Sequence, residues 1–184
     1  CNPLNIRPYL DLGLMYKHGK GVSKDSTEAA EWYRKAAEQG NPNAQVNLGL
    51  MYRYGEGVHR SVSEAVQWYR KAAEQGNANG QLYLGLMYED GAGVPKNHDE
   101  ALKWYRMSAN QGNDSAQFNM GSMYKRGNGV PQDDIEAANW YRKSAEQGNM
   151  FAQYELGLMY AHGTGLPQNS VEALKWYRKA ADQG

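Results

Sequence analysis

The 184-residue chain has little of several features that would assign a protein to a class at once. It has one cysteine, Cys1, so no intrachain disulfide can form. The cysteine content therefore does not indicate whether the protein lies in an oxidising or a reducing compartment. The 20 Lys and Arg residues balance the 20 Asp and Glu residues, and a net charge of zero gives no reason to expect a nucleic-acid partner. No apolar run approaches the length of a membrane span. A disulfide framework, a membrane-spanning helix and a general polyanion binder are therefore all disfavoured.

Cys1 has two interpretations, and both stay open. In the favoured one it is an arbitrary first residue. In the other it is the lipidated first residue of a mature bacterial lipoprotein, which would anchor the chain to a membrane. The chain shows no secretory signal and does not begin with Met, as expected if its natural N-terminus is missing.

A repeat organises the rest of the chain. The segment 48–52 has the sequence LGLMY, and its counterparts follow one another at intervals of 36 residues. The glycine of this segment recurs at Gly13, Gly49, Gly85, Gly121 and Gly157. A fixed period of this length is typical of a repeat array. We expect a single solenoid over residues 1–184, with repeats at 5–40, 41–76, 77–112, 113–148 and 149–184.

The first half of each repeat predicts a helix, which we call helix A. In the second repeat it runs from about residue 42 to residue 54, with Asn41 as its N-cap and Pro42 at the first helical position. The other repeats begin with Asn5, Asn77, Asn113 and Asn149. Gly49 lies inside the helix, where glycine costs about 1 kcal/mol relative to alanine. Its recurrence in all five repeats predicts close approach of a neighbouring helix backbone at this point.

A Gly-x-Gly turn follows each helix A, as at Gly55 and Gly57, and is expected to end the helix and turn the chain. A phosphate cradle is disfavoured because the pattern follows a helix, not a strand. The second half of each repeat then predicts helix B, with an N-cap three residues before a glutamate. These caps are Asp25, Ser61, Asn97, Asp133 and Asn169. Because a glutamate recurs at the same distance from the N-cap in every repeat, a capping role for the glutamates is favoured over acid catalysis or metal binding.

Helix B carries an apolar stripe and ends at a glycine. In the second repeat the stripe includes Ala65, Trp68 and Tyr69, so the five Trp-Tyr pairs are expected in the core and not on a binding surface. Arg70 is expected on the solvent face. Gly76 supplies the left-handed residue after helix B, and the short link that follows makes successive helices antiparallel neighbours.

The motif A-x-x-x-L-G-x-M-Y-x-x-G-x-G-V, followed by E-A-x-x-W-Y-R-K-A-A-E-Q-G-N, resembles the Sel-one-like repeat (SLR) family, a tetratricopeptide-like helical repeat. The resemblance covers about 180 of the 184 residues in five copies. It implies an all-α fold, an α/α right-handed superhelical solenoid of five antiparallel helix pairs. It further implies that helices A line the concave side, and that the protein serves as a bacterial adaptor or scaffold. Some secreted relatives carry a disulfide in every repeat, and this chain cannot.

The two ends differ in how closely they follow the pattern. In the first repeat Pro8 and Tyr9 replace the Ala44-Gln45 pair of the second, which suggests a modified starting repeat. The last repeat stays regular as far as Gly184 and has no polar cap. Because an open solenoid end exposes an apolar face, we expect that the natural chain continues past 184 or that a partner covers this end.

Variation between repeats concentrates on helix A positions that, by the resemblance, face the concave side. The central positions mix aromatic residues with both charges, as protein-binding surfaces do. They predict a protein-binding site at Arg53, Tyr54, Tyr83, Glu89, Asp90, Phe118, Lys125 and Arg126. Unconstrained drift of surface residues is the alternative interpretation.

The sequence gives little support to catalysis, and it predicts no catalytic residue, cofactor or metal site. The four histidines are far apart, and no nucleophile motif of a known kind occurs. We therefore expect a non-enzymatic interaction module whose partner is a protein or peptide. The alternatives are an envelope or secreted bacterial protein that acts on a host target or neutralises a toxin, and a cell-wall or β-lactam hydrolase. The expected location is the bacterial periplasm or envelope, or outside the cell, with the cytoplasm as alternative.

Overall fold

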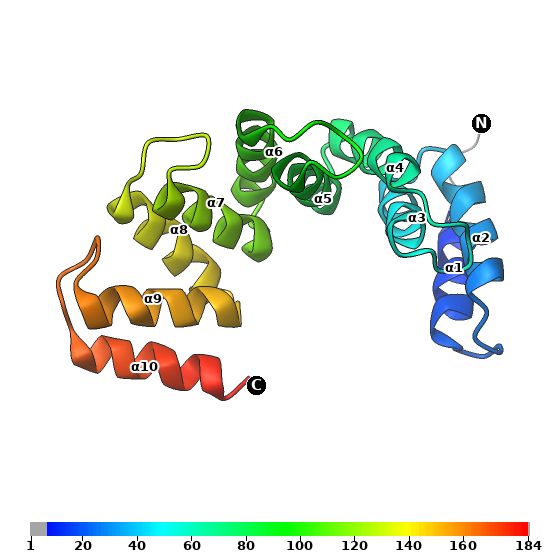
Figure 1. The fold of residues 1–184 in the computed structure, drawn as a ribbon. Coiled ribbons are helices and arrows are strands. Elements are labelled where there is room, and N and C mark those ends of the chain that lie inside the picture. Colours follow the sequence, from blue (N-terminus) through cyan, green and yellow to red (C-terminus); the bar gives the residue numbers. More distant parts are fainter. Residues whose placement is uncertain (1–6, 184) are drawn as a thin grey trace. The chain divides into compact units, whose positions relative to one another are not determined.

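The computed structural model describes residues 7–183, and the regular structure in this range is helical throughout (Figure 1). Close contacts divide the chain into two compact halves, Cys1–Asn97 and His98–Gly184, and we describe each half by itself. Cys1 and the first expected N-cap, Asn5, lie outside the described residues. None of the helices in the described range combines the length and the apolar character that crossing a bilayer requires.

The N-terminal half contains α1 (Arg7–His18), α2 (Ser26–Glu38), α3 (Pro42–Tyr54), α4 (Val62–Glu74) and α5 (Ala78–Asp90). The C-terminal half contains α6 (His98–Asn110), α7 (Asp114–Arg126), α8 (Asp134–Glu146), α9 (Met150–His162) and α10 (Ser170–Ala181). Within each half every helix packs against the next one in the chain, and α3 also contacts α5. The odd-numbered helices are helices A and the even-numbered ones are helices B.

The expected caps form the helix ends. The Asn41 side chain accepts a hydrogen bond from the Ala44 backbone N–H at 2.9 Å, and Ser61 Oγ accepts from the Glu64 N–H at 3.3 Å. At the other end of α3, Gly55 takes the left-handed conformation with φ of 75°. These contacts satisfy backbone groups that a helix end leaves unpaired, and they confirm the boundaries predicted for helix A and the start of helix B.

The tyrosine of the Trp-Tyr pair lies at the centre of the first four repeats. Tyr33, Tyr69, Tyr105 and Tyr141 are fully buried, which confirms the expected core position for these four. Tyr177 of the fifth repeat is half-buried, as are Trp32 and Trp140. The glycine of helix A lies directly against this ring: a Cβ atom on Gly49 would come within 2.6 Å of Tyr69 Cε1. The prediction of a neighbouring backbone was therefore wrong. The glycine makes room for an aromatic side chain, and the repeated tyrosine explains the repeated glycine.

The second glycine of the Gly-x-Gly turn has a separate role in the second to fifth repeats, which is contact with the preceding repeat. Gly57 has a φ of 67°, and a Cβ atom there would overlap the backbone carbonyl of Ser26 at the start of α2. A Cβ on Gly129 would come within 2.9 Å of the His98 carbonyl oxygen. The turn thus ends helix A and also rests on the helix B before it.

Two kinds of hydrogen bond join successive repeats. The glutamine of helix A is buried and donates to a carbonyl near the end of the preceding helix B, as Gln45 Nε2 does to the Ala37 oxygen at 3.1 Å. The arginine of helix B donates to a tyrosine of the following helix A, as Arg70 Nη2 does to Tyr88 Oη at 2.9 Å. Arg70 was expected on the solvent face. It is instead half-buried and holds the next repeat in place.

Replacing Gln117 by leucine should lower the free energy of unfolding by about 1–3 kcal/mol, because two hydrogen bonds of a buried side chain are lost. Gln117 donates to the Ala109 carbonyl at 3.2 Å and accepts from Gln147 Nε2 at 2.7 Å. Urea denaturation followed by circular dichroism measures the change. Gln67→Leu on the exposed face of α4 is the control and should change stability by about 0.5 kcal/mol or less. Equal effects of the two substitutions would contradict a structural role for the glutamine.

Candidate functional site

Five of the eight predicted binding residues lie in the N-terminal half, on α3 and α5, and we call them the first patch. They are Arg53, Tyr54, Tyr83, Glu89 and Asp90. Tyr54 is 60% exposed, and the Arg53 guanidinium carbon lies 5.6 Å from the centre of its ring. Tyr83 is half-buried, because its ring stacks on that of Tyr69 at 5.2 Å between centroids. Tyr54 and Arg53 are thus the accessible anchors, while Tyr83 is partly a packing residue.

Electrostatics link three members of the first patch. Burial raises the pKa of Tyr83, the neighbouring Tyr54 raises it further, and the Arg53 guanidinium opposes both effects. Arg53 opposes the effect of burial on the pKa of Tyr69 in the same way. Tyr54 and Arg53 therefore both lie close enough to Tyr83 to influence its pKa. Glu89 is half-buried and Asp90 is exposed at the C-terminal end of α5.

The other three predicted residues, Phe118, Lys125 and Arg126, lie on α7 in the C-terminal half and form the second patch. Phe118 is half-buried and lies 5.6 Å from the Tyr141 ring and 6.1 Å from the Phe151 ring, between centroids. Lys125 pairs with Glu155 of α9, with 2.6 Å between Nζ and Oε2. Arg126 is exposed. Partners on the next helix A thus fix Phe118 and Lys125, and Arg126 is the most accessible member.

The buried Tyr141 hydroxyl lies beneath the second patch. Burial is the main reason that its pKa is raised, and the negative charge of Glu155 raises it further. A hydrogen bond with Ser122 and the positive charge of Arg126 act in the opposite direction. The charges of α7 and α9 therefore act on one buried phenol, which remains neutral over the ordinary pH range.

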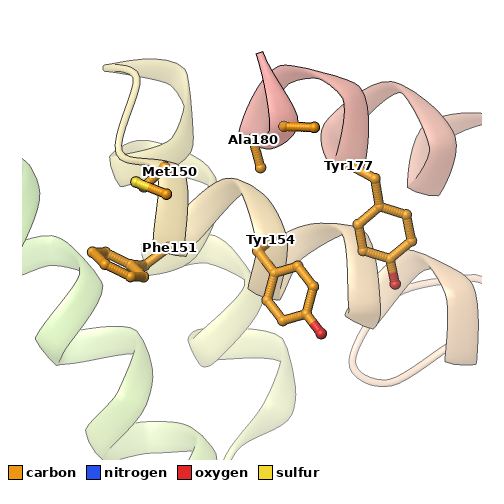
Figure 2. A pocket seen from close by; sticks show the side chains of 6 residues that line it. Met150, Phe151, Tyr154, Tyr177 and Ala180 are labelled. Atoms are coloured by element: carbon orange, nitrogen blue, oxygen red, sulfur yellow. The ribbon is translucent and has the colours of Figure 1, made fainter. Parts of the chain in front are cut away.

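A pocket between α9 and α10 was not predicted from the sequence. It has a volume of about 590 Å³, and its lining is mostly apolar: Met150, Phe151, Tyr154, Tyr177, Ala180 and Ala181. In Figure 2 the Tyr154 and Tyr177 rings lie side by side with their hydroxyls pointing the same way, while the Ala180 methyl points into the space beside them. Phe151 is 62% exposed and Tyr154 is 52% exposed. Large aromatic side chains with this much exposure are typical of a contact surface.

A signal for this pocket was present in the sequence. Met150 stands where earlier repeats have Pro42, Ala78 and Asp114, and Phe151 stands where they have Asn43, Asn79 and Ser115. The second of these positions carries a small polar residue in three repeats and an aromatic residue only in the fifth. The binding residues predicted from the sequence lie toward the middle and end of helix A, whereas this change lies at the start of the helix.

The histidines and the other potential metal ligands of residues 7–183 are dispersed over several helices and loops. No group of three or more potential metal ligands occurs in this part of the chain. His18 and His162 end α1 and α9, His98 begins α6, and His59 lies in a loop. The surfaces described above present exposed aromatic and charged side chains, among them Tyr54, Phe151 and Arg126.

Two solved bacterial structures resemble the chain over nearly its whole length. One is a protective antigen of uropathogenic Escherichia coli with an SLR fold: it is 42% identical with a TM-score of 0.91, and the match covers 97% of this chain and 38% of the antigen. The other is a Sel1 repeat protein from Oxalobacter formigenes: it is 41% identical with a TM-score of 0.93, and the match covers 100% of this chain and 74% of that one. This chain thus spans well under half the length of the antigen.

A more distant structure shares the fold alone. It is an immunity protein from Pseudomonas aeruginosa, 24% identical with a TM-score of 0.66, and the match covers 100% of this chain and 66% of that protein. No curated protein sequence matches the chain.

The family comparison agrees with the repeat architecture. The model of the Sel1 repeat matches residues 9–41, 42–77, 78–113, 114–149 and 151–184. Proteins built from this repeat are helical solenoids and generally serve as non-catalytic protein-interaction modules. Because five successive matches account for nearly all of its residues, the chain belongs to the Sel1 repeat family.

Proposed function

We propose that the chain is a non-enzymatic protein-interaction module that binds a protein or peptide through its helix A surfaces. The observation that carries this proposal is the first patch, where exposed Tyr54 lies beside Arg53 while Tyr83 is held in place by Tyr69. A rigid aromatic next to a cation gives a binding surface contact area at a low cost in side-chain entropy. The second patch adds exposed Arg126, while Phe118 and Lys125 are already fixed by neighbours.

The charges of the first patch suggest the chemistry of the ligand. Arg53 is cationic and half-buried, while Glu89 and Asp90 place carboxylates near the end of the neighbouring helix A. A ligand that presents an aromatic or aliphatic side chain to Tyr54, an acidic group to Arg53 and a basic group to Asp90 would complement this surface. An extended peptide of mixed charge fits this description better than a polyanion does, and the balanced overall charge agrees.

Site-specific photo-crosslinking tests the proposal. A benzophenone amino acid at Tyr54 reports on the helix A surface, and the same amino acid at Gln67, an exposed residue of α4, is the matched control on helix B. Bacterial envelope extracts and host-cell extracts would each be irradiated with both proteins. We expect a protein that crosslinks at position 54 and not at position 67. Its capture by unlabelled chain should fall by about tenfold or more in Tyr54→Ala, because an interface anchor contributes at least about 1–2 kcal/mol.

Two outcomes would contradict the proposal. Equal crosslinking at positions 54 and 67 would mean non-specific contact. A captured protein whose binding is unchanged in Tyr54→Ala, Arg53→Ala and Arg126→Ala would place the binding surface elsewhere. Because Tyr54 and Arg126 are exposed, these substitutions should leave the helical circular dichroism unchanged.

A further inference from the structure

Two cations of the N-terminal half occupy the same repeat position near the end of helix A. They are Lys17 of α1 and Arg53 of α3, and both side chains are half-buried. No carboxylate within residues 7–183 forms an ion pair with either of them. In this part of the chain both positive charges are therefore left without an acidic partner.

The C-terminal half shows what the chain can place against a cation at this position. Lys125 of α7 is the equivalent residue, and its Nζ lies 2.6 Å from Oε2 of Glu155, 30 residues further along. The residues 30 positions after the other two cations are Asn47 and Tyr83. All three cations lie in the last turn of a helix, so the helix dipole favours each of them and does not explain the difference. In the N-terminal half a neutral side chain thus stands where the C-terminal half supplies a carboxylate.

The two neutral residues cannot compensate the positive charges, but both can donate hydrogen bonds to an anion. Burial raises the pKa of Tyr83, so its hydroxyl stays protonated at neutral pH. Asn47 is half-buried, and its amide forms no hydrogen bond with another side chain or backbone group of the described range. A carboxylate bound at either cation would therefore be offered an ion pair and a neutral hydrogen-bond donor together.

The exposed Tyr54 ring lies next to Arg53, whose guanidinium carbon is 5.6 Å from the ring centre. The equivalents of Lys17 and Tyr54 in the last two repeats are Lys125 and His162. These two residues line one pocket, so successive helices A bring their two positions together. By this equivalence Tyr54 has one cation from its own helix and one, Lys17, from the helix A before it.

Carboxylates on α5 limit the kind of anion that fits. α5 contacts α3, and it ends with half-buried Glu89 and exposed Asp90. A long polyanion such as a nucleic acid would bring further phosphates toward these carboxylates, and the chain has no net positive charge to hold it. A peptide segment can instead place acidic side chains at the two cations and other residue types elsewhere.

We propose that Lys17 and Arg53 bind two acidic side chains of a partner protein, with an apolar side chain between them in contact with Tyr54. The inference rests on the proposed function and adds the chemistry of the partner, which is an extended segment with Asp or Glu on both sides of an apolar residue. Side-chain carboxylates are favoured over a chain end because two cations call for two carboxylates, whereas a C-terminus supplies one. The glutamate that pairs with Lys125 is the model for each contact.

A phage-displayed library of random heptapeptides, selected against the whole chain, tests this inference. We expect the enriched peptides to carry Asp or Glu on both sides of an apolar residue. The tightest of them would be synthesised with an amidated C-terminus and titrated by fluorescence anisotropy. Arg53→Gln and Lys17→Gln should each weaken its binding about threefold to tenfold, because each removes one partly exposed ion pair.

Lys71→Gln is the matched control, because it removes the same charge from an exposed residue of α4 in the same half. It should leave the affinity for the peptide unchanged. A charge-reversed chain with Lys17→Glu and Arg53→Glu should select peptides that carry Lys or Arg in place of the acidic residues. A purely structural role of the two cations would not change the charge of the selected peptides.

Four results would overturn the inference and leave the proposed function standing. They are selected peptides that need Tyr54 but lack acidic residues, equal effects of Arg53→Gln and Lys71→Gln, binding only of peptides with a free C-terminal carboxylate, and equally tight binding of a poly-dT oligonucleotide. A selection that yields no peptide sensitive to Tyr54→Ala would instead contradict the proposed function, and the inference with it.

Discussion

Replacing Gly57 by alanine should lower the free energy of unfolding by about 2–5 kcal/mol. The left-handed backbone at this position, with φ of 67°, costs an alanine about 1–2 kcal/mol. The new methyl group would also overlap the Ser26 carbonyl, and the resulting overpacking adds about 1–3 kcal/mol. Because the obstacle is backbone at the start of α2, no side-chain rotation can relieve it. Urea denaturation followed by far-ultraviolet circular dichroism measures the effect.

Gly21→Ala is the matched control, because Gly21 has the same place in the first repeat and no helix B precedes it among the described residues. Its φ is 76°, and a Cβ atom there would meet only the flexible end of Met15, at 3.5 Å. We expect this variant to lose about 1–2 kcal/mol, the cost of the left-handed backbone alone. If Gly21→Ala and Gly57→Ala destabilised the protein equally, contact with α2 would not be the reason for the second glycine.

Alkaline pH should unfold the protein in a step that follows ionisation of its buried tyrosines. Burial raises the pKa of Tyr33 from 10.0 to about 12, and it raises the pKa values of Tyr69 and Tyr141 as well. A raised pKa means that the folded state favours the neutral phenol. The stabilisation is therefore complete below pH 10 and is lost as the pH rises toward 12. For Tyr33 alone, two pH units correspond to about 2–3 kcal/mol.

Tyrosinate absorbance and circular dichroism, recorded in one pH titration, check this expectation. The exposed tyrosines should ionise first, and the remaining ones should ionise together with loss of helix. Tyr33→Phe provides the control, since the Tyr33 hydroxyl has no hydrogen-bond partner among the described residues and its removal leaves no group unpaired. The variant should unfold at higher pH than the parent. An unchanged midpoint would show that ionisation of Tyr33 does not contribute.

The repeat period and the cap residues predicted the helices closely, because both are local properties of the chain. Asn41 and Gly55 set the limits of α3 with no reference to tertiary contacts. The partners of individual residues were harder to predict, because they depend on how helices stack. Gly49 faces the Tyr69 ring instead of a backbone, and Arg70 reaches Tyr88 in the next repeat instead of solvent.

The predicted binding residues show the same difference: the exposure of a side chain could be predicted, but its partners could not. Tyr54 and Arg126 are exposed as the variation between repeats suggested, and Arg53 lies beside Tyr54. Variation alone could not show that Tyr83 stacks on Tyr69 or that Lys125 pairs with Glu155, since both contacts join different helices. The joint cluster expected from α3, α5 and α7 stays a prediction.

Residues 32–37 of α2 and residues 68–73 of α4 have the identical sequence WYRKAA. This identity bears on how such a chain can change its length. Loss of residues 41–76 would place the WYRKAA segment of α2 against α5, whose Gly80 and Gln81 already dock on the same six residues in α4. The contact of the small residue Gly80 would again be with alanine, and Tyr88 would again accept a hydrogen bond from an arginine. Unequal crossing-over in the coding sequence can therefore remove or add a whole 36-residue repeat. The interface formed at the junction would have the same contacts as the existing interfaces between repeats.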